Sequence, residues 1–338
     1  MTRRHHLLDE DDVRVRPQRG KSRPRSKDRP DHAEATSAVV MTVDRGRFTV
    51  ERPDGTEVYA VKARELGRKG IVVGDRVDLV GDTSGTVDTQ ARIVRRLERT
   101  STLRRTADDT DPVERVIVAN ATRLAVVTAT ADPEPRTGLI DRAMVAALDA
   151  GIEPMLVLTK TDLAPPDALM ALYGPLELPV FEIRNREIPT ALREALAGQV
   201  TVLVGHSGVG KSTLVNALIP TADRVIGHVN AVTGRGRHTS TSVVALHLTG
   251  GGLLIDTPGI RSFGLAHVDV TRVIHAFPDL GALTEHCPRA CSHDEPDCAL
   301  NDLSGVDGDV EALTVRVDSL RRMVRSRAAS VEDDEPRG

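Results

Sequence analysis

Aromatic side chains make up only 2% of this 338-residue chain, and tryptophan is absent. Proteins that bind single-stranded nucleic acid usually stack bases on aromatic rings, so any contact with RNA is expected to involve mainly phosphates and shape. Cysteine is also scarce, and all three cysteines lie within residues 287–298. This clustering argues against a secreted disulfide scaffold and favours a metal site in a reducing compartment.

Long apolar runs are missing as well. No segment approaches the roughly 18 apolar residues that a membrane span needs, and the N-terminal sequence MTRRHHLLDEDD lacks the apolar region of a signal peptide. We therefore expect a cytoplasmic protein with no membrane partner. The net charge of −4 does not by itself indicate a nucleic-acid binder.

Positive charge is concentrated near the N-terminus. Residues 13–29 carry eight basic side chains against one acid, Asp28. Residues 1–35 contain too few large apolar side chains to offset the entropy cost of ordering, so we expect a disordered basic tail. A solvated tail with no role and an arm that neutralises RNA phosphates are both open interpretations. Residues 331–338 are expected to form a second disordered tail.

Residues 36–104 are predicted to form a small β-barrel of the OB type. Five short β-rich runs alternate there with turn signals at roughly ten-residue spacing, which is typical of a small barrel. A sandwich normally needs more strands.

Residues 105–267 are predicted to form an α/β domain. Four continuous apolar runs are separated by helical stretches, which predicts a parallel sheet covered on both faces. These runs are residues 123–130, 154–160, 200–205 and 252–257. Residues 243–248 are expected to pair with the last run as an edge hairpin. Residues 268–330 then combine a Cys/His cluster with a helix over 308–329.

The sequence GHSGVGKS at residues 205–212 fits the phosphate-binding pattern G-x-x-x-x-G-K-[ST] between a predicted strand and a predicted helix. Its glycines let backbone N–H groups cradle phosphates, Lys211 adds positive charge, and the Ser212 hydroxyl is expected to bind Mg²⁺. The alternative is a Gly-rich turn of no function, which this context disfavours. The predicted phosphate-binding residues are Gly205, His206, Ser207, Gly208, Val209, Gly210, Lys211, Ser212 and Thr213.

A second phosphate element is predicted at Asp256-Thr257-Pro258-Gly259, which ends another apolar strand. DTPG alone is a common turn, but its place downstream of a phosphate loop indicates function. Asp256 is expected to hold Mg²⁺ through water, and the Gly259 N–H to meet the γ-phosphate.

The sequence Thr159-Lys160-Thr161-Asp162 looks like the guanine-specificity motif of GTPases. Its aspartate accepts hydrogen bonds from guanine N1 and N2, a donor pair that adenine lacks, and Lys160 packs along the ring. The usual first residue is Asn, so Thr159 is expected to give the loop weaker local support. The residues Phe181–Asn185, where a further base-contacting loop belongs, lack the usual Ser-Ala signal, and we expect backbone contacts there.

The order of the motifs is unusual, because the base motif precedes the phosphate loop and DTPG follows it. This order predicts a circularly permuted GTPase domain, which assembles the same site when the original termini lie close together. The base motif argues against a metabolite kinase or an ATPase.

The chain resembles the RsgA (YjeQ) family of ribosome small-subunit-dependent GTPases. The resemblance rests on the OB-like module, the permuted motif order, the sequence GRGRHTST at 234–241 and the Cys/His cluster. It implies a monomeric GTPase that binds the 30S ribosomal subunit and 16S rRNA late in maturation, with GTP hydrolysis driving release. The alternative is a nucleotide-gated RNA-binding scaffold with negligible hydrolysis.

The segment between the phosphate loop and DTPG is where a GTPase places its first switch. Thr239, or else Thr241, is expected to complete the Mg²⁺ shell. Ile260 occupies the position at which Ras-like enzymes orient the attacking water, and isoleucine cannot do so. His238 is therefore the candidate catalytic residue, although an exposed loop histidine is the simpler alternative. Arg235 and Arg237 are interpreted as rRNA phosphate contacts rather than as an arginine finger.

Cys287, Cys291, His293 and Cys298 supply three thiolates and one imidazole, a complete tetrahedral set for structural Zn²⁺. The alternative is a set of free thiols. The first and last gaps are each about one residue shorter than in the family pattern, so His286 is a substitute candidate ligand.

Overall fold

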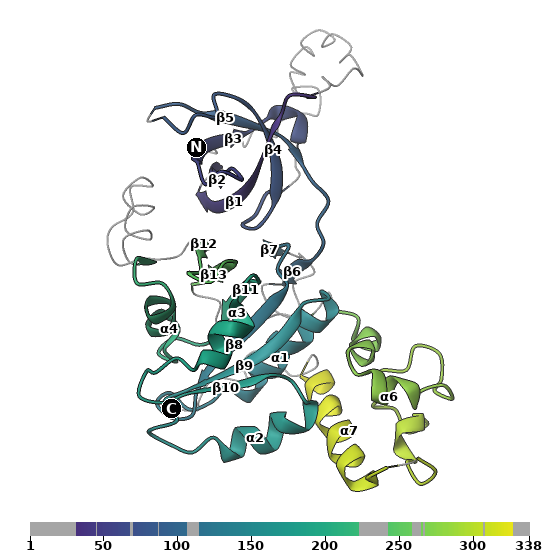
Figure 1. Cartoon of the computed structure of the whole chain (residues 1–338). Helices are drawn as coiled ribbons and strands as arrows, with labels where there is room; N and C mark the ends of the chain where they lie inside the picture. The colour runs from purple at the N-terminus through teal and green to yellow at the C-terminus, as the bar shows by residue number, and fades with distance from the viewer. Residues whose placement is uncertain are drawn as a thin grey trace, which may run out of the picture. The chain divides into compact units, whose positions relative to one another are not determined.

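The computed structural model describes most of the chain between residues 32 and 326 (Figure 1). The described residues are 32–44, 46–67, 70–86, 88–106, 115–222, 243–258, 265, 268–306 and 308–326. The predicted C-terminal tail, and all but the last four residues of the predicted basic tail, lie outside this set, so their disorder stays a prediction. In the part of the chain that is described, no helix is both long and apolar enough to cross a bilayer.

Five strands near the N-terminus form a closed barrel, as predicted. They follow the order β1-β2-β3-β5-β4, and β4 pairs back with β1 to close the ring. Every second residue of most strands faces the barrel core, which holds Phe48 and Val50 from β2 and Val77 and Leu79 from β4. The strands are β1 (Thr36–Asp44), β2 (Arg47–Glu51), β3 (Glu57–Lys62), β4 (Arg76–Gly81) and β5 (Ala91–Arg96), with a short 3₁₀ helix at Arg64–Leu66.

An antiparallel pair follows the barrel, formed by β6 (Thr102–Arg105) and β7 (Arg115–Ala119). The sequence pattern did not predict this pair. The domain limits inferred from composition stay predictions.

The predicted parallel sheet is confirmed. Its strand order is β10-β9-β8-β11-β13-β12; the first five strands are parallel, and β12 pairs antiparallel with β13 as the expected hairpin. The expected edge position is wrong, because β12 also pairs with β1 at Val244 and Thr42. The strands are β8 (Arg123–Ala129), β9 (Glu153–Thr159), β10 (Val180–Ile183), β11 (Val200–Val204), β12 (Val244–His247) and β13 (Leu253–Asp256). The short strand β10 was not predicted.

The sheet is covered on both faces because alternate residues of its buried strands enter two different hydrophobic clusters. On β8, Leu124 and Val126 belong to one cluster, whereas Ala125 and Val127 belong to the other. Helices α1 (Thr137–Asp149) and α2 (Asp167–Tyr173) pack into the first, and α3 (Thr190–Leu196) and α4 (Lys211–Leu218) into the second. A 3₁₀ turn at Gly174–Leu176 follows α2.

The C-terminal region shares the first of these clusters. Its long helix α7 buries Val317, Leu320 and Met323 in the same core as α1. The elements of this region are η4 (Val270–Ala276), α6 (Pro278–Ala282), η5 (Ala299–Asn301) and α7 (Val310–Arg325), the last of which confirms the predicted C-terminal helix (Figure 1).

Candidate functional site

The phosphate loop lies between the carboxyl end of β11 and the first residue of α4. Its backbone needs glycine at both ends. A Cβ atom at Gly205 would meet the Val127 carbonyl oxygen at 2.2 Å, and Gly210 has a φ of +98° directly before α4 begins. A larger residue at Gly205 or Gly210 would therefore clash or strain the backbone. With glycine at both positions, the loop can adopt the conformation in which its N–H groups face a phosphate.

Lys211 and Asp256 are two half-buried charges of this loop region. Lys211 Nζ donates to the carbonyl oxygens of Gly205 and His206, the latter at 3.0 Å. Burial lowers the pKa of Lys211, and the charge of Asp256 partly opposes this shift. Burial likewise raises the pKa of Asp256, against the effect of Lys211. Burial thus disfavours the charged forms of both side chains. A bound phosphate would stabilise the positive charge of Lys211, and a bound cation would stabilise the negative charge of Asp256.

Asp256 also fits the predicted Mg²⁺ role. Its Oδ1 atom is buried and has no hydrogen-bond partner within the described residues. A buried carboxylate oxygen without a donor is an acceptor for a metal-bound water. Ser212 and Thr213 lie in the first turn of α4 and are exposed. Thr239, Thr241, His238, Gly259 and Ile260, with Arg235 and Arg237, lie outside the described residues, so their roles stay predictions.

The base motif meets the phosphate loop through Thr159. The Thr159 hydroxyl donates to the Val209 carbonyl oxygen at 2.6 Å, and its side chain is buried against Gly210. Lys160 follows with a φ of +58° and donates to the Asp132 carbonyl oxygen. Threonine in place of asparagine thus still connects the two loops.

Asp162 is held by the loop after β10. The strands β9 and β10 end in register, with Thr159 beside Ile183, so the loops that follow them are neighbours. The Asn185 N–H donates to Asp162 Oδ1 at 3.1 Å; the expected backbone contacts of this loop with the base stay a prediction. Residues of this loop, the base motif and the phosphate loop together line a cavity of about 620 Å³; its lining includes Lys160, Asp162, Asn185, Arg186, Gly208, Gly210 and Thr213.

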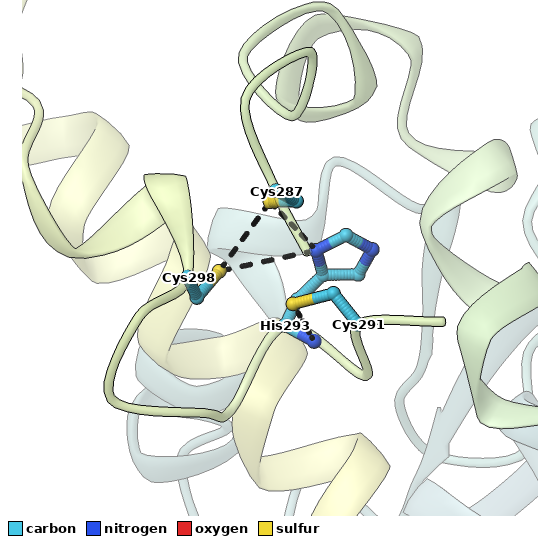
Figure 2. A group of neighbouring side chains, drawn as sticks. All are labelled: Cys287, Cys291, His293 and Cys298. Carbon is cyan, nitrogen blue, oxygen red and sulfur yellow. Dashed lines mark hydrogen bonds between the residues drawn. The ribbon is translucent and has the colours of Figure 1, made fainter. Parts of the chain in front are cut away.

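The four predicted metal ligands come together in the C-terminal region (Figure 2). All four ligand atoms lie within 4.8 Å of one another. Cys287 Sγ is 3.8 Å from Cys298 Sγ and 3.7 Å from His293 Nδ1, which matches the edges of about 3.8 Å expected for a tetrahedron of 2.3 Å Zn–S bonds. His286 is exposed and does not belong to the group. The cluster can hold a metal ion.

Burial favours the neutral forms of the thiols and of the imidazole in this cluster. Burial raises the pKa of the Cys287 and Cys291 thiols, so a metal ion must displace their protons. Burial lowers the pKa of His293, which leaves the imidazole neutral and its ring nitrogen able to act as a ligand.

Glu295 supports the metal loop and was missed by the sequence analysis. Its carboxylate accepts hydrogen bonds from Ser292 N, Ser292 Oγ and Asp294 N at 2.8–3.2 Å. The hydrogen bond from Cys291, together with those from Ser292, lowers the pKa of Glu295 to about 2. A carboxylate four residues after a ligand is too common a pattern to have revealed this role.

Arginines of α7 join the metal loop to the α/β domain. Arg321 donates to the His293 carbonyl oxygen at 2.8 Å, and Arg325 pairs with Asp294. On the other side, Arg322 pairs with the buried Asp141 of α1 and lies 4.7 Å from the centre of the Tyr173 ring. These arginine side chains therefore form hydrogen bonds and ion pairs within the protein. The basic composition of the helix did not predict these contacts.

Comparisons with known proteins agree with this geometry. The family model described as RsgA GTPase matches residues 96–266. A Pseudomonas aeruginosa (strain LESB58) protein named small ribosomal subunit biogenesis GTPase RsgA is 43% identical over 240 residues, covering 68% of this chain and 69% of its own. The protein of that name from Pseudomonas syringae pv. tomato is 40% identical over 290 residues, covering 82% and 81%.

Solved structures show the same architecture. YjeQ from Thermotoga maritima matches with a TM-score of 0.63 and 25% identity, covering 87% of this chain and 99% of its own. YloQ, described as a circularly permuted GTPase, matches in fold with a TM-score of 0.61 and 23% identity, covering 92% and 100%. The permuted motif order, the barrel and the family match agree, and the chain belongs to the RsgA GTPase family.

Proposed function

We propose that this protein is a GTPase of small ribosomal subunit biogenesis, which binds the 30S subunit through its 16S rRNA and hydrolyses GTP there to drive its own release. The relatives that cover two thirds or more of the chain carry the name of such a GTPase. The observation that carries the proposal is a cavity lined by residues of both the base motif and the phosphate loop. Ribosome assembly in bacteria places the protein in the cytoplasm.

Guanine is selected by Asp162, whose carboxylate accepts from N1–H and the N2 amine. The phosphate loop holds the β- and γ-phosphates through its N–H groups and Lys211. Ser212 and Thr239 would hold Mg²⁺ directly, and Asp256 through water. When bound, Mg²⁺ supplies charge neutralisation for the phosphates. The buried Asp256 Oδ1, which has no hydrogen-bond partner among the described residues, supports this assignment.

Hydrolysis needs a group that orients the attacking water. Ile260 offers no polar atom, and His238 in the switch segment is the group that we assign to this role. The imidazole can orient water only from a defined position of the switch segment. We therefore expect binding to the ribosomal subunit to control the rate of hydrolysis.

Zinc is the metal that the Cys/His cluster fits best. Three thiolates and one imidazole with tetrahedral edges leave no open position, so Cys287, Cys291, His293 and Cys298 would hold a structural ion. The bound ion would link a loop-rich region to the core that it shares with α1. The barrel and this region would then contact rRNA, with the protein acting as a monomer.

The test is GTP hydrolysis by the purified protein with and without purified 30S subunits, for the parent and for His238→Ala. His247→Ala is the matched control, because His247 is exposed on β12 and its ring contacts Glu51 at 2.7 Å rather than the nucleotide loops. We expect strong stimulation by 30S subunits that the His238 variant loses and the His247 variant keeps.

Other outcomes separate the alternatives. Tight GTP binding without stimulated turnover would favour the RNA-binding scaffold with negligible hydrolysis. Stimulation that survives in His238→Ala would keep the function and remove the water-orienting role from His238. Equal use of ATP and GTP would contradict the guanine site itself.

A further inference from the structure

The loop after β10 forms a tight turn at the base end of the cavity. Its central residues, Asn185 and Arg186, both have positive φ, at 52° and 64°, and the Glu187 N–H donates to the Arg184 carbonyl oxygen at 2.9 Å. This is the pattern of a type I′ turn. Because β9 and β10 end in register, the turn lies beside the base motif.

The hydrogen bonds of the turn leave Arg186 available. The Asn185 N–H is used on Asp162, and the Glu187 N–H closes the turn. The Arg186 N–H and guanidinium have no hydrogen-bond or ion-pair partner within the residues that the structure describes, although Arg186 lines the cavity. Lys160, the other basic residue of the lining, donates to the Asp132 carbonyl oxygen.

The chemistry of guanine defines what such donors can bind. Asp162 takes N1–H and the N2 amine, and the next atoms along the ring edge are O6 and N7, which are both acceptors. Asn185 bonds the Asp162 carboxylate, so the residue that follows it is the candidate for contact with the neighbouring O6 and N7 atoms. Arginine is the side chain most often used to bind guanine at O6 and N7.

We propose that the Arg186 guanidinium binds the O6 and N7 edge of the nucleotide base. This inference rests on the proposed function, since it requires a guanine nucleotide in the cavity. It assigns Arg186 as a specificity-determining residue and explains how the site works without a Ser-Ala sequence in this loop.

Arg186→Gly removes the side chain and keeps the turn. Glycine adopts a positive φ without strain, so this variant should fold at least as well as the parent. Arg186→Lys keeps the charge but not the planar donor group. Arg184→Ala is the matched control, because Arg184 is an exposed arginine of the same turn that does not line the cavity.

The measurement is the Kd for GDP, for 7-deaza-GDP, which lacks N7, and for ADP. We expect the parent to bind GDP about tenfold more tightly than 7-deaza-GDP, in line with one charge-assisted hydrogen bond. Arg186→Gly should bind GDP about tenfold more weakly and no longer distinguish it from 7-deaza-GDP. Arg186→Lys should lie between the two, and Arg184→Ala should match the parent.

A second analogue separates main chain from side chain. The diphosphate of 6-thioguanosine keeps N1–H and the 2-amino group but has sulfur, a weaker acceptor, in place of O6, and Arg186→Gly should still bind it more weakly than GDP if a main-chain donor of the turn contacts this position. An unchanged preference for GDP over 7-deaza-GDP in Arg186→Gly would overturn the inference while leaving the proposed function intact. A parent that binds ADP as tightly as GDP would overturn both.

Discussion

The Thr159 hydroxyl is the direct connection between the base motif and the phosphate loop, and Thr159→Val removes it while keeping the side-chain shape. The hydroxyl donates to the Val209 carbonyl oxygen at 2.6 Å, and the residue is 5% exposed. Water therefore cannot replace the lost donor easily. Thr159→Ser keeps the hydroxyl and serves as the conservative variant.

The size of the effect follows from the hydrogen bond. A neutral hydrogen bond contributes about 0.5–1.5 kcal/mol, and a buried carbonyl left without a donor costs about 1–3 kcal/mol. Part of this loss appears as lower stability of the free protein, because the loops are connected before nucleotide binds. We expect about 1–2 kcal/mol in nucleotide affinity, which weakens GDP binding about 5- to 30-fold.

The assay is an equilibrium titration with a fluorescent guanosine diphosphate, beside a thermal unfolding curve for each variant. Thr190→Val is the control, because Thr190 is exposed at the first residue of α3. Thr159→Ser and Thr190→Val should bind within about twofold of the parent. Parent-like affinity and an unchanged unfolding midpoint in Thr159→Val would refute the idea that this hydroxyl connects the loops.

Three further predictions concern the C-terminal region. The parent should contain one metal ion per molecule in elemental analysis, and Cys298→Ser should lose it and unfold at a lower temperature, since Cys298 belongs to the proposed ligand set and is buried in the core shared with α1; full metal content in the variant would contradict the ligand set. Arg322→Met should lower the free energy of unfolding by about 2–4 kcal/mol, because it leaves Asp141 buried without this partner; a urea titration that shows under about 1 kcal/mol would contradict this. Burial raises the pKa of Asp279, but the hydrogen bond and charge of Arg316 outweigh it and leave the pKa below the ordinary value of 3.8. The stability from this pair should therefore be complete above pH 3.8 and be lost as the pH falls through the lowered pKa, so the difference in unfolding midpoint between the parent and Asp279→Asn should shrink in acid; a constant difference would argue against the pair.

Patterns of buried residues made the two main β structures predictable. The strands of the α/β sheet are buried on both faces, so they read as continuous apolar runs such as 123–130. The barrel strands have one buried face and show alternation instead, as Phe48 and Val50 do. Motif order along the chain was sufficient to indicate the permutation, because each phosphate or base element follows its own strand.

Contacts between distant residues were not predictable in the same way. Strand β10 has only four residues, and its place is set by pairing with β9 rather than by its own composition. Thr159 and Val209 are 50 positions apart, and Arg322 and Asp141 are 181 positions apart. Nothing in the local sequence of these residues specifies a partner, because charge and hydrogen-bonding capacity alone are compatible with solvent.

The Cys/His cluster contains every thiol of the chain. With a metal ion bound, no cysteine remains free to react with a thiol reagent, so the ion protects the protein against alkylation and against cross-linking between molecules. A cysteine introduced at an exposed position would then be the sole target of a fluorescent label. In the unmodified protein, one third of the number of thiols that react would give the number of molecules without a metal ion.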